Sequence, residues 1–216
     1  MVAVVVAVGC GGDPAPAPVT ARPVVVPEEV QEAAFKVAIL GDSITAGYGL
    51  PLDQAFPAVI ERTLQAEGLD VSVHNNGVSG DTSAGGARRV DWVLKQAPNV
   101  LVVELGGNDL LRGQPVSLTE EKLGEIVQAG RAAGAEVVLL GITAPGSVGP
   151  DHKAAFDAIY PKVAEVHGAR LVPGFLDGLM DKPALVQSDG LHPTADGHRM
   201  LAEVLTPVLR ELTKAP

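Results

Sequence analysis

The sequence is poor in cysteine, in aromatic residues and in basic residues relative to acidic ones. Its one cysteine, Cys10, excludes an internal disulfide and any metal or redox site built on paired cysteines. Aromatic residues make up 3% of the chain, too few for a surface that stacks on the bases of single strands. The 26 acidic and 16 basic residues give a net charge of −10, which repels phosphate backbones. We therefore expect no nucleic-acid partner.

Apolar residues, in contrast, are plentiful. They make up 46% of the 216 residues, which excludes a disordered chain. A chain of this length fits one domain, which buries roughly 70% of its unfolded surface and needs no metal or disulfide in order to fold. We expect one compact, acidic, monomeric domain.

The first residues differ in composition from the rest. Residues 1–8 are mainly Val and Ala, and they are too few to span a bilayer, which needs about 20 apolar residues. Small residues and Cys10 follow, which resembles a bacterial lipoprotein signal with Cys10 as the lipidated residue, although no positively charged stretch precedes it. We interpret 1–10 as a truncated export or lipoprotein-like signal; an ordinary secretory signal or an N-terminal extension is the alternative. The Pro/Ala-rich segment 11–34 is typical of a tether.

On this interpretation, we expect a bacterial protein that is exported to the periplasm or cell envelope. Lipidated Cys10 would tether it to a membrane surface.

In 35–214 short apolar runs alternate with amphipathic segments. The runs predict strands at 36–40, 71–74, 100–103, 136–142 and 169–172. The helix-period segments are 54–67, 88–96, 117–133 (opening on a capping box, Ser117 to Glu120), 153–166 and 194–212. Apolar strands that alternate with amphipathic helices indicate an α/β fold with a parallel sheet covered on both faces.

Four polar or Gly-rich segments stand where such a fold places its ligand site, beyond the carboxyl ends of the strands. Three of them follow strands and the fourth precedes the last helix; they are 41–43, 77–83, 106–109 and 189–193. We expect these segments to converge on one crevice.

Two of the segments hold the side chains that acyl transfer uses. Ser43 follows the first strand, and a serine hydroxyl becomes a good nucleophile only beside a base. His192 is a suitable base, and Asp189, three residues earlier, can hold the other ring nitrogen. The simpler alternative is a helix cap and two loop residues. Asp196 and His198 stand near His192 without a recognised ligand spacing, so we expect no metal.

The other two segments offer hydrogen-bond donors for the oxyanion of a tetrahedral intermediate. Gly80 can present its backbone N–H closely because it has no Cβ, and Asn108 can present its side-chain amide. Both residues are also common in plain turns. Residues 77–86 contain no phosphate-loop motif, and Thr45 stands where the nucleophile elbow of α/β-hydrolases has glycine.

Taken together, the segments resemble the SGNH (GDSL-type) hydrolases. The matching blocks are Gly41-Asp-Ser43, Gly80 within 79–83, Gly107-Asn-Asp109 and Asp189-Gly-Leu-His192-Pro193. The strings at 39–43, 46–49 and 158–162 are similar to the bacterial TesA-like subgroup of arylesterases, acyl-CoA thioesterase I and lysophospholipase L1. The resemblance covers about 36–212.

The resemblance implies a flavodoxin-like three-layer α/β/α sandwich with about five parallel strands. It implies Ser43 as nucleophile, Asp189 and His192 as the rest of a triad, and Ser43, Gly80 and Asn108 as oxyanion donors. It also implies that no metal or organic cofactor takes part. The segment 143–149 is small and glycine-rich where thioesterase relatives carry a bulkier loop, so it does not indicate which acyl length is preferred.

The resulting hypothesis is a serine ester hydrolase for small acyl esters or thioesters, with arylesterase, thioesterase or lysophospholipase activity. A carbohydrate O-acetyl esterase of the same superfamily is one alternative. A non-catalytic, lipid-binding lipoprotein of the envelope is the other, which an intact set of catalytic residues disfavours.

Overall fold

The computed structural model describes residues 1–4 and 34–214. The described residues 34–214 belong to one folded unit. The predicted signal, the tether and the lipidation site Cys10 lie outside the described residues and stay predictions. No helix of the described ranges is both long and apolar enough to cross a membrane.

The centre of the unit is a parallel sheet of five strands, ordered β2-β1-β3-β4-β5. The strands are β1 (Phe35–Gly41), β2 (Val71–Gly77), β3 (Val100–Glu104), β4 (Glu136–Leu140) and β5 (Arg170–Val172). This sheet confirms the predicted α/β class and has the flavodoxin-like strand order. The fourth strand ends at Leu140, two residues before the predicted Ile142.

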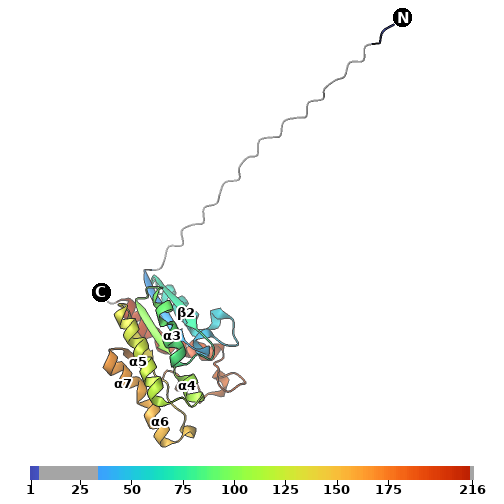
Figure 1. The fold of residues 1–216 in the computed structure, drawn as a ribbon. Coiled ribbons are helices and arrows are strands. Elements are labelled where there is room, and N and C mark those ends of the chain that lie inside the picture. Colours follow the sequence, from blue (N-terminus) through green and yellow to red (C-terminus); the bar gives the residue numbers. More distant parts are fainter. Residues whose placement is uncertain (5–33, 215–216) are drawn as a thin grey trace. The chain divides into compact units, whose positions relative to one another are not determined.

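Helices cover both faces of the sheet (Figure 1). One face carries α3 (Ser83–Leu94), α5 (Val116–Ala132) and α7 (Ile159–His167), and the other carries α2 (Phe56–Ala66) and α8 (Ala195–Thr213). Strand β1 shows why two faces are needed: Ala38 and Leu40 are buried toward the first layer, Val37 and Ile39 toward the second. The shorter helices are α1 (Ser43–Ala46), α4 (Gly107–Leu111) and α6 (Pro150–Asp157).

Three helix predictions need correction. The predicted helix 153–166 is two helices, α6 and α7, that meet at Ala158. Pro161 explains the break, because it has no N–H to donate and its ring collides with the carbonyl of residue 157 in a continuous helix. The capping box is wrong as well, since α5 begins at Val116 after Pro115 and has no side-chain cap.

The third correction concerns α3, which begins at Ser83 and not at Arg88. The Thr82 side chain caps it by accepting from the N–H of Gly85. The sequence pattern hid this first turn because Gly85 and Gly86 suggest a loop. Both positions are crowded in the structure: a Cβ at Gly85 would overlap the Asp81 carboxylate, and one at Gly86 would overlap Leu105.

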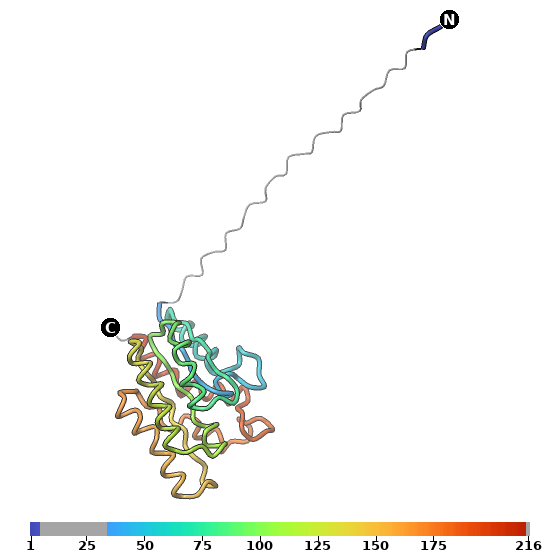
Figure 2. Tube along the Cα trace, in the orientation of Figure 1, coloured from blue at the N-terminus to red at the C-terminus, as the bar shows by residue number. Residues whose placement is uncertain are grey.

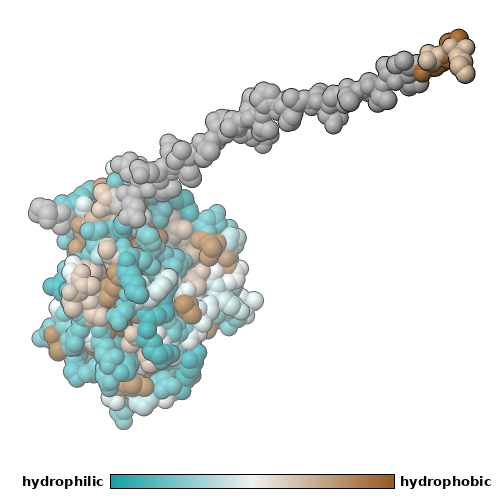
Figure 3. All heavy atoms as spheres, turned by 45° about the horizontal axis from the view of Figure 1, so that its top comes forward, coloured by the Kyte–Doolittle hydropathy of each residue, from teal (hydrophilic) through white to brown (hydrophobic). Residues whose placement is uncertain are grey.

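The strand order places the site. Sequence order reverses between β1 and β3, and the crevice at such a reversal is the usual ligand site of open α/β sheets. Ser43 follows β1 and Asn108 follows β3, so both lie at this reversal. Figure 2 shows the loops after β1 and before α8 on the same side of the unit. On the face shown in Figure 3, apolar side chains form small separate groups within a polar surface, as is ordinary for folded proteins.

Candidate active site

A tight turn between β1 and α1 presents Ser43. Asp42 is the N-cap of α1, and its Oδ1 accepts from the Ile44 N–H at 3.0 Å. Gly41 leaves room for this turn, because a Cβ there would overlap the side chain of Thr45. Ser43 is thus the first residue of the helix, and 9% of it is exposed.

Ser43 begins a chain of hydrogen bonds. Its Oγ lies 2.9 Å from Nε2 of His192, and Nδ1 of His192 lies 2.7 Å from Oδ2 of Asp189. The structure therefore brings together the three residues that the sequence predicts as a triad. In the sequence, Ser43 lies near the start of the folded unit and His192 near its end, 149 positions apart.

The turn 189–192 holds Asp189 in its ionised form. Its Oδ1 accepts from the N–H groups of Leu191 and His192, at 2.9 and 3.0 Å. The hydrogen bond to the His192 ring, together with these two backbone bonds, lowers the pKa of Asp189 to about 2. An ionised Asp189 requires the proton of the ring on Nδ1, which leaves Nε2 to accept from the Ser43 hydroxyl.

The two predicted oxyanion donors lie on separate segments, Gly80 in the loop after β2 and Asn108 in helix α4. Gly80 has a left-handed backbone, with φ of +80°, and its carbonyl accepts from Nη2 of Arg112 at 2.7 Å. Arg112 is the C-cap of α4, the helix that holds Asn108, so this bond joins the Gly80 loop to that helix. The Asn108 side chain lines the same pocket as Ser43, and its Nδ2 donates to Oδ2 of Asp42 at 3.0 Å.

Below the nucleophile turn lies a pair of buried acids that the sequence interpretation left without a role. Glu104, at the end of β3, is fully buried, and Asp42 is 3% exposed. Thr45 donates its hydroxyl to Oε2 of Glu104 at 2.8 Å, whereas Oε1 has no hydrogen-bond partner among the described residues. Asp42 is inside a quoted block and Glu104 directly follows the predicted strand 100–103, but contact between them depends on the pairing of β1 with β3.

Burial raises the pKa of both acids, but to different extents. Burial, followed by the charge of Asp42, raises the pKa of Glu104 well above its usual value. Burial also raises the pKa of Asp42, but hydrogen bonds to its carboxylate, including those from Ile44 and Asn108, oppose that effect. Burial and the Asp42 charge thus favour the neutral form of Glu104, while hydrogen bonds favour the ionised form of Asp42.

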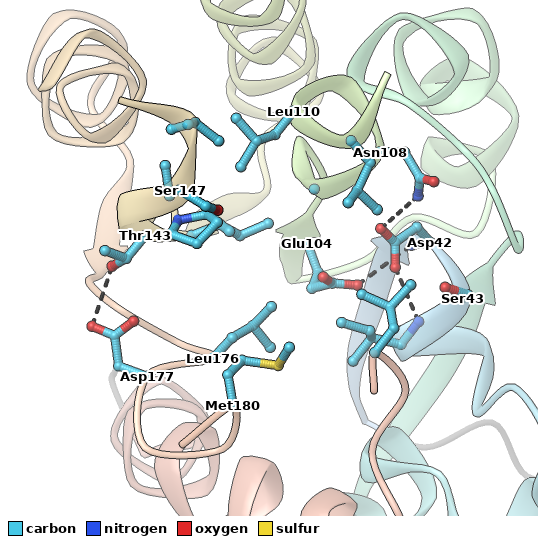
Figure 4. Close-up of a pocket in the computed structure, with 18 of the residues that line it drawn as sticks. Asp42, Ser43, Glu104, Asn108, Leu110, Thr143, Ser147, Leu176, Asp177 and Met180 are labelled. Carbon is cyan, nitrogen blue, oxygen red and sulfur yellow. Dashed lines mark hydrogen bonds between the residues drawn. The ribbon is translucent and has the colours of Figure 1, made fainter. Parts of the chain in front are cut away.

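A pocket of about 730 Å³ opens beside Ser43. Figure 4 shows Asp42, Ser43 and Asn108 at one end of it, with Thr143, Leu176 and Asp177 across the cavity. Most of its other lining side chains are apolar: Ile44, Leu110, Leu111, Ile142, Val148, Met180 and Leu191. This size and lining are typical of a small-molecule site and suit an acyl chain.

Asp196 and His198, the residues near His192 that could serve as metal ligands, each have another partner in the structure. The His198 Nδ1 accepts from the backbone N–H of Phe56, and Asp196 pairs with Arg199. Within 1–4 and 34–214, no group of three or more potential ligands could hold a metal ion.

Comparison with known proteins confirms the family that the sequence blocks resemble. The model of the GDSL-like Lipase/Acylhydrolase family matches residues 39–200. Esterase TesA of Pseudomonas aeruginosa is 40% identical over 84% of this chain and 91% of its own length. The arylesterase of Vibrio mimicus is 36% identical, over 85% of this chain and 90% of its own. Thioesterase 1/protease 1/lysophospholipase L1 of Escherichia coli is 40% identical, over 83% of this chain and 86% of its own.

A solved structure agrees with these sequence matches. The crystal structure of TesA superposes with a TM-score of 0.79, at 40% identity, and covers 82% of this chain and 99% of that one. The model match spans well over half of the chain, and the three relatives exceed 30% identity over most of it. The chain therefore belongs to the GDSL-like lipase/acylhydrolase family, the SGNH group of ester hydrolases.

Proposed function

We propose that the protein hydrolyses carboxylic esters, and thioesters of the same acyl groups, through a covalent acyl-enzyme on Ser43. The hydrogen-bonded series Ser43, His192 and Asp189 is the single observation that carries this proposal. His192 takes the Ser43 proton as the oxygen attacks the acyl carbonyl, and Asp189 fixes the tautomer that can do so.

The second half of the site stabilises the charge that forms on the former carbonyl oxygen. We assign this role to the N–H groups of Ser43 and Gly80 and to the Asn108 amide. Asp42 holds Nδ2 of Asn108 through one of its two amide hydrogens, so the other hydrogen is free for the oxyanion.

The reaction then proceeds in two steps. His192 gives its proton to the leaving alcohol or thiol, and the acyl group stays on Ser43. His192 next takes a proton from water, which attacks the acyl-enzyme. As the bond to Ser43 breaks and the carboxylic acid leaves, His192 returns that proton to the Ser43 oxygen. Every proton and bond in these steps is accounted for by Ser43, His192, water and substrate, so the proposal needs no metal or cofactor.

The acyl pocket favours chains longer than acetate. A volume of about 730 Å³ with mostly apolar walls exceeds what an acetyl group fills. The pocket thus supports an aryl ester, thioester or lysophospholipid substrate over an acetylated sugar.

For the N-terminal region we keep the hypothesis of export, with a membrane tether through Cys10. For the folded unit we keep the hypothesis that it is a monomer.

The test uses the full chain and p-nitrophenyl esters from acetate to palmitate, with Ser43→Ala as the matched variant. We expect activity to peak at a medium acyl length and to fall by about a thousandfold or more in the variant. A fluorophosphonate probe should label the wild type at Ser43 and leave the variant unlabelled.

Other outcomes lead to the alternatives. Activity confined to acetyl esters, with acid released from acetylated xylan, would support the O-acetyl esterase. A folded wild type that neither hydrolyses any ester nor reacts with the probe would support a non-catalytic lipid-binding protein. More than a few per cent of activity in Ser43→Ala would overturn the assignment of the nucleophile.

A further inference from the structure

Tyr48 lies in a tightly fixed turn beside the site. Gly47 and Gly49 flank it with left-handed backbones, φ of +74° and +79°, which L side chains rarely adopt. The side chain of Gln187 donates from Nε2 to the carbonyls of Tyr48 and Pro193, at 2.8 and 2.9 Å. The turn is thereby tied to the segment that holds His192.

The ring of Tyr48 covers one face of the His192 ring. The ring centroids are 4.3 Å apart and the planes are inclined by 34°. Tyr48 nevertheless stays 52% exposed, so a large part of its surface is free at the mouth of the site. Tyr48 and His192 do not line the acyl pocket, which begins at Ser43 and extends toward Leu176 and Asp177.

The chemistry of the proposed reaction fixes where the leaving group must be. Its oxygen receives the proton from Nε2 of His192, so it must come within hydrogen-bond reach of that atom. With the acyl chain in the pocket, the rest of the alcohol lies on the open side of Ser43. The exposed ring of Tyr48 lies on this side, in tilted contact with the ring of the proton donor.

We propose that Tyr48 is a specificity-determining residue that contacts the leaving group and favours alcohols that carry an aromatic ring. The proposal rests on the function proposed above and adds a class of leaving group to it. Offset or tilted contact between rings stabilises a complex beyond the area that it buries, which a saturated ring of similar size does not match.

The experiment compares two substrates with the same acyl group. Benzyl butyrate and cyclohexylmethyl butyrate both release a primary alcohol with a six-membered ring, and only the first ring is aromatic. Acid release gives kcat and KM for the full-length wild type and for Tyr48→Phe, Tyr48→Leu and Tyr48→Met. Leu52→Ala, which removes an exposed apolar side chain four positions away, is the control.

We expect the wild type and Tyr48→Phe to prefer the benzyl ester. In Tyr48→Leu and Tyr48→Met the ratio of kcat/KM values should fall by about threefold or more. Leu52→Ala should keep the wild-type ratio. Two aliphatic variants are included so that one misfolded protein does not decide the result, and melting curves identify such a protein.

An equal loss of activity on both esters in the aliphatic variants would overturn the proposal, because Tyr48 would then only hold the His192 ring. An unchanged ratio with unchanged rates would overturn it too. Failure of the proposed function is distinguishable from either result, since the wild type itself would then hydrolyse neither ester.

Discussion

The two halves of the site differ in their exposure to solvent. On the proton-transfer half, made of Ser43, His192 and Asp189, the Asp189 side chain is 40% exposed and that of His192 is 13% exposed. On the oxyanion half, Asp42 and Glu104 lie below Asn108 and are buried almost completely. In the first half, hydrogen bonds lower the pKa of the half-exposed Asp189, and in the second half, burial raises the pKa of Glu104. Burial and hydrogen bonding together thus set the charge of each acid.

The largest expected effect tests the exposed acid. Asp189→Asn should lower kcat for p-nitrophenyl butyrate by about a thousandfold or more, because the amide favours the wrong tautomer of His192. The backbone bonds to position 189 can persist with Asn, so the fold should be retained. Asp177→Asn, the same change across the pocket, is the control. A rate within threefold of the wild type would require another residue as the acid.

The next effect tests the oxyanion donor that the buried half positions. Asn108→Ala should lower kcat by about a hundredfold or more and change KM little, since the lost donor acts on the transition state. Asn99→Ala is the control: Asn99 accepts from the Lys36 N–H and lies at the opposite end of the strands. A rise in KM without a change in kcat would make Asn108 a substrate-binding residue instead.

A smaller effect concerns stability and acid. His198 is fully buried, and burial, followed by the charge of His192, lowers its pKa to about 4. The unfolded chain has an ordinary histidine and takes up a proton near pH 6.5, so stability falls as pH drops from 6.5 toward 4. This group contributes up to about 3 kcal/mol to that fall.

The measurement is urea unfolding at several pH values, with His198→Asn beside the wild type. Asn cannot gain the proton, and its oxygen can still accept from the Phe56 N–H. The difference in unfolding free energy between the two proteins should therefore shrink as the pH falls through this range. A constant difference would show that His198 is protonated to the same extent in the native and the unfolded protein.

The smallest expected effect concerns Glu104, and it tests most directly how the buried acid differs from the exposed Asp189. Glu104→Gln is the same change, acid to amide, as Asp189→Asn, yet we expect kcat within about twofold of the wild type. A neutral buried acid and an amide have similar shape, and both accept from Thr45. Glu104→Leu, which leaves the Thr45 hydroxyl without its acceptor, should lower stability. A large loss of kcat in Glu104→Gln would mean that Glu104 is ionised.

The sequence predicted much of this molecule from local patterns. Continuous apolar runs identified the strands, since a strand buried on both faces needs them. Asp189 and His192 could be paired from their spacing, because two side chains three positions apart in one turn can reach each other. The family blocks added Ser43, Gly80 and Asn108. Helix ends were less predictable. The role of Gly85 and Gly86 depends on the side chains that crowd them, whereas the break at Pro161 follows from a local property of proline that the apolar period of 153–166 does not show.

The sequence by itself determined the α/β class and the parallel sheet, because these depend on residue type and short-range order, and its family blocks implied the proposed catalytic residues. The tertiary structure decided the rest. Only the pairing of β1 with β3 brings Asp42 onto Glu104, and only the packing of the 189–193 turn against α1 brings His192 to Ser43 and Tyr48. Contacts between residues far apart in the chain have no local pattern, and they set burial, charge and access at the site.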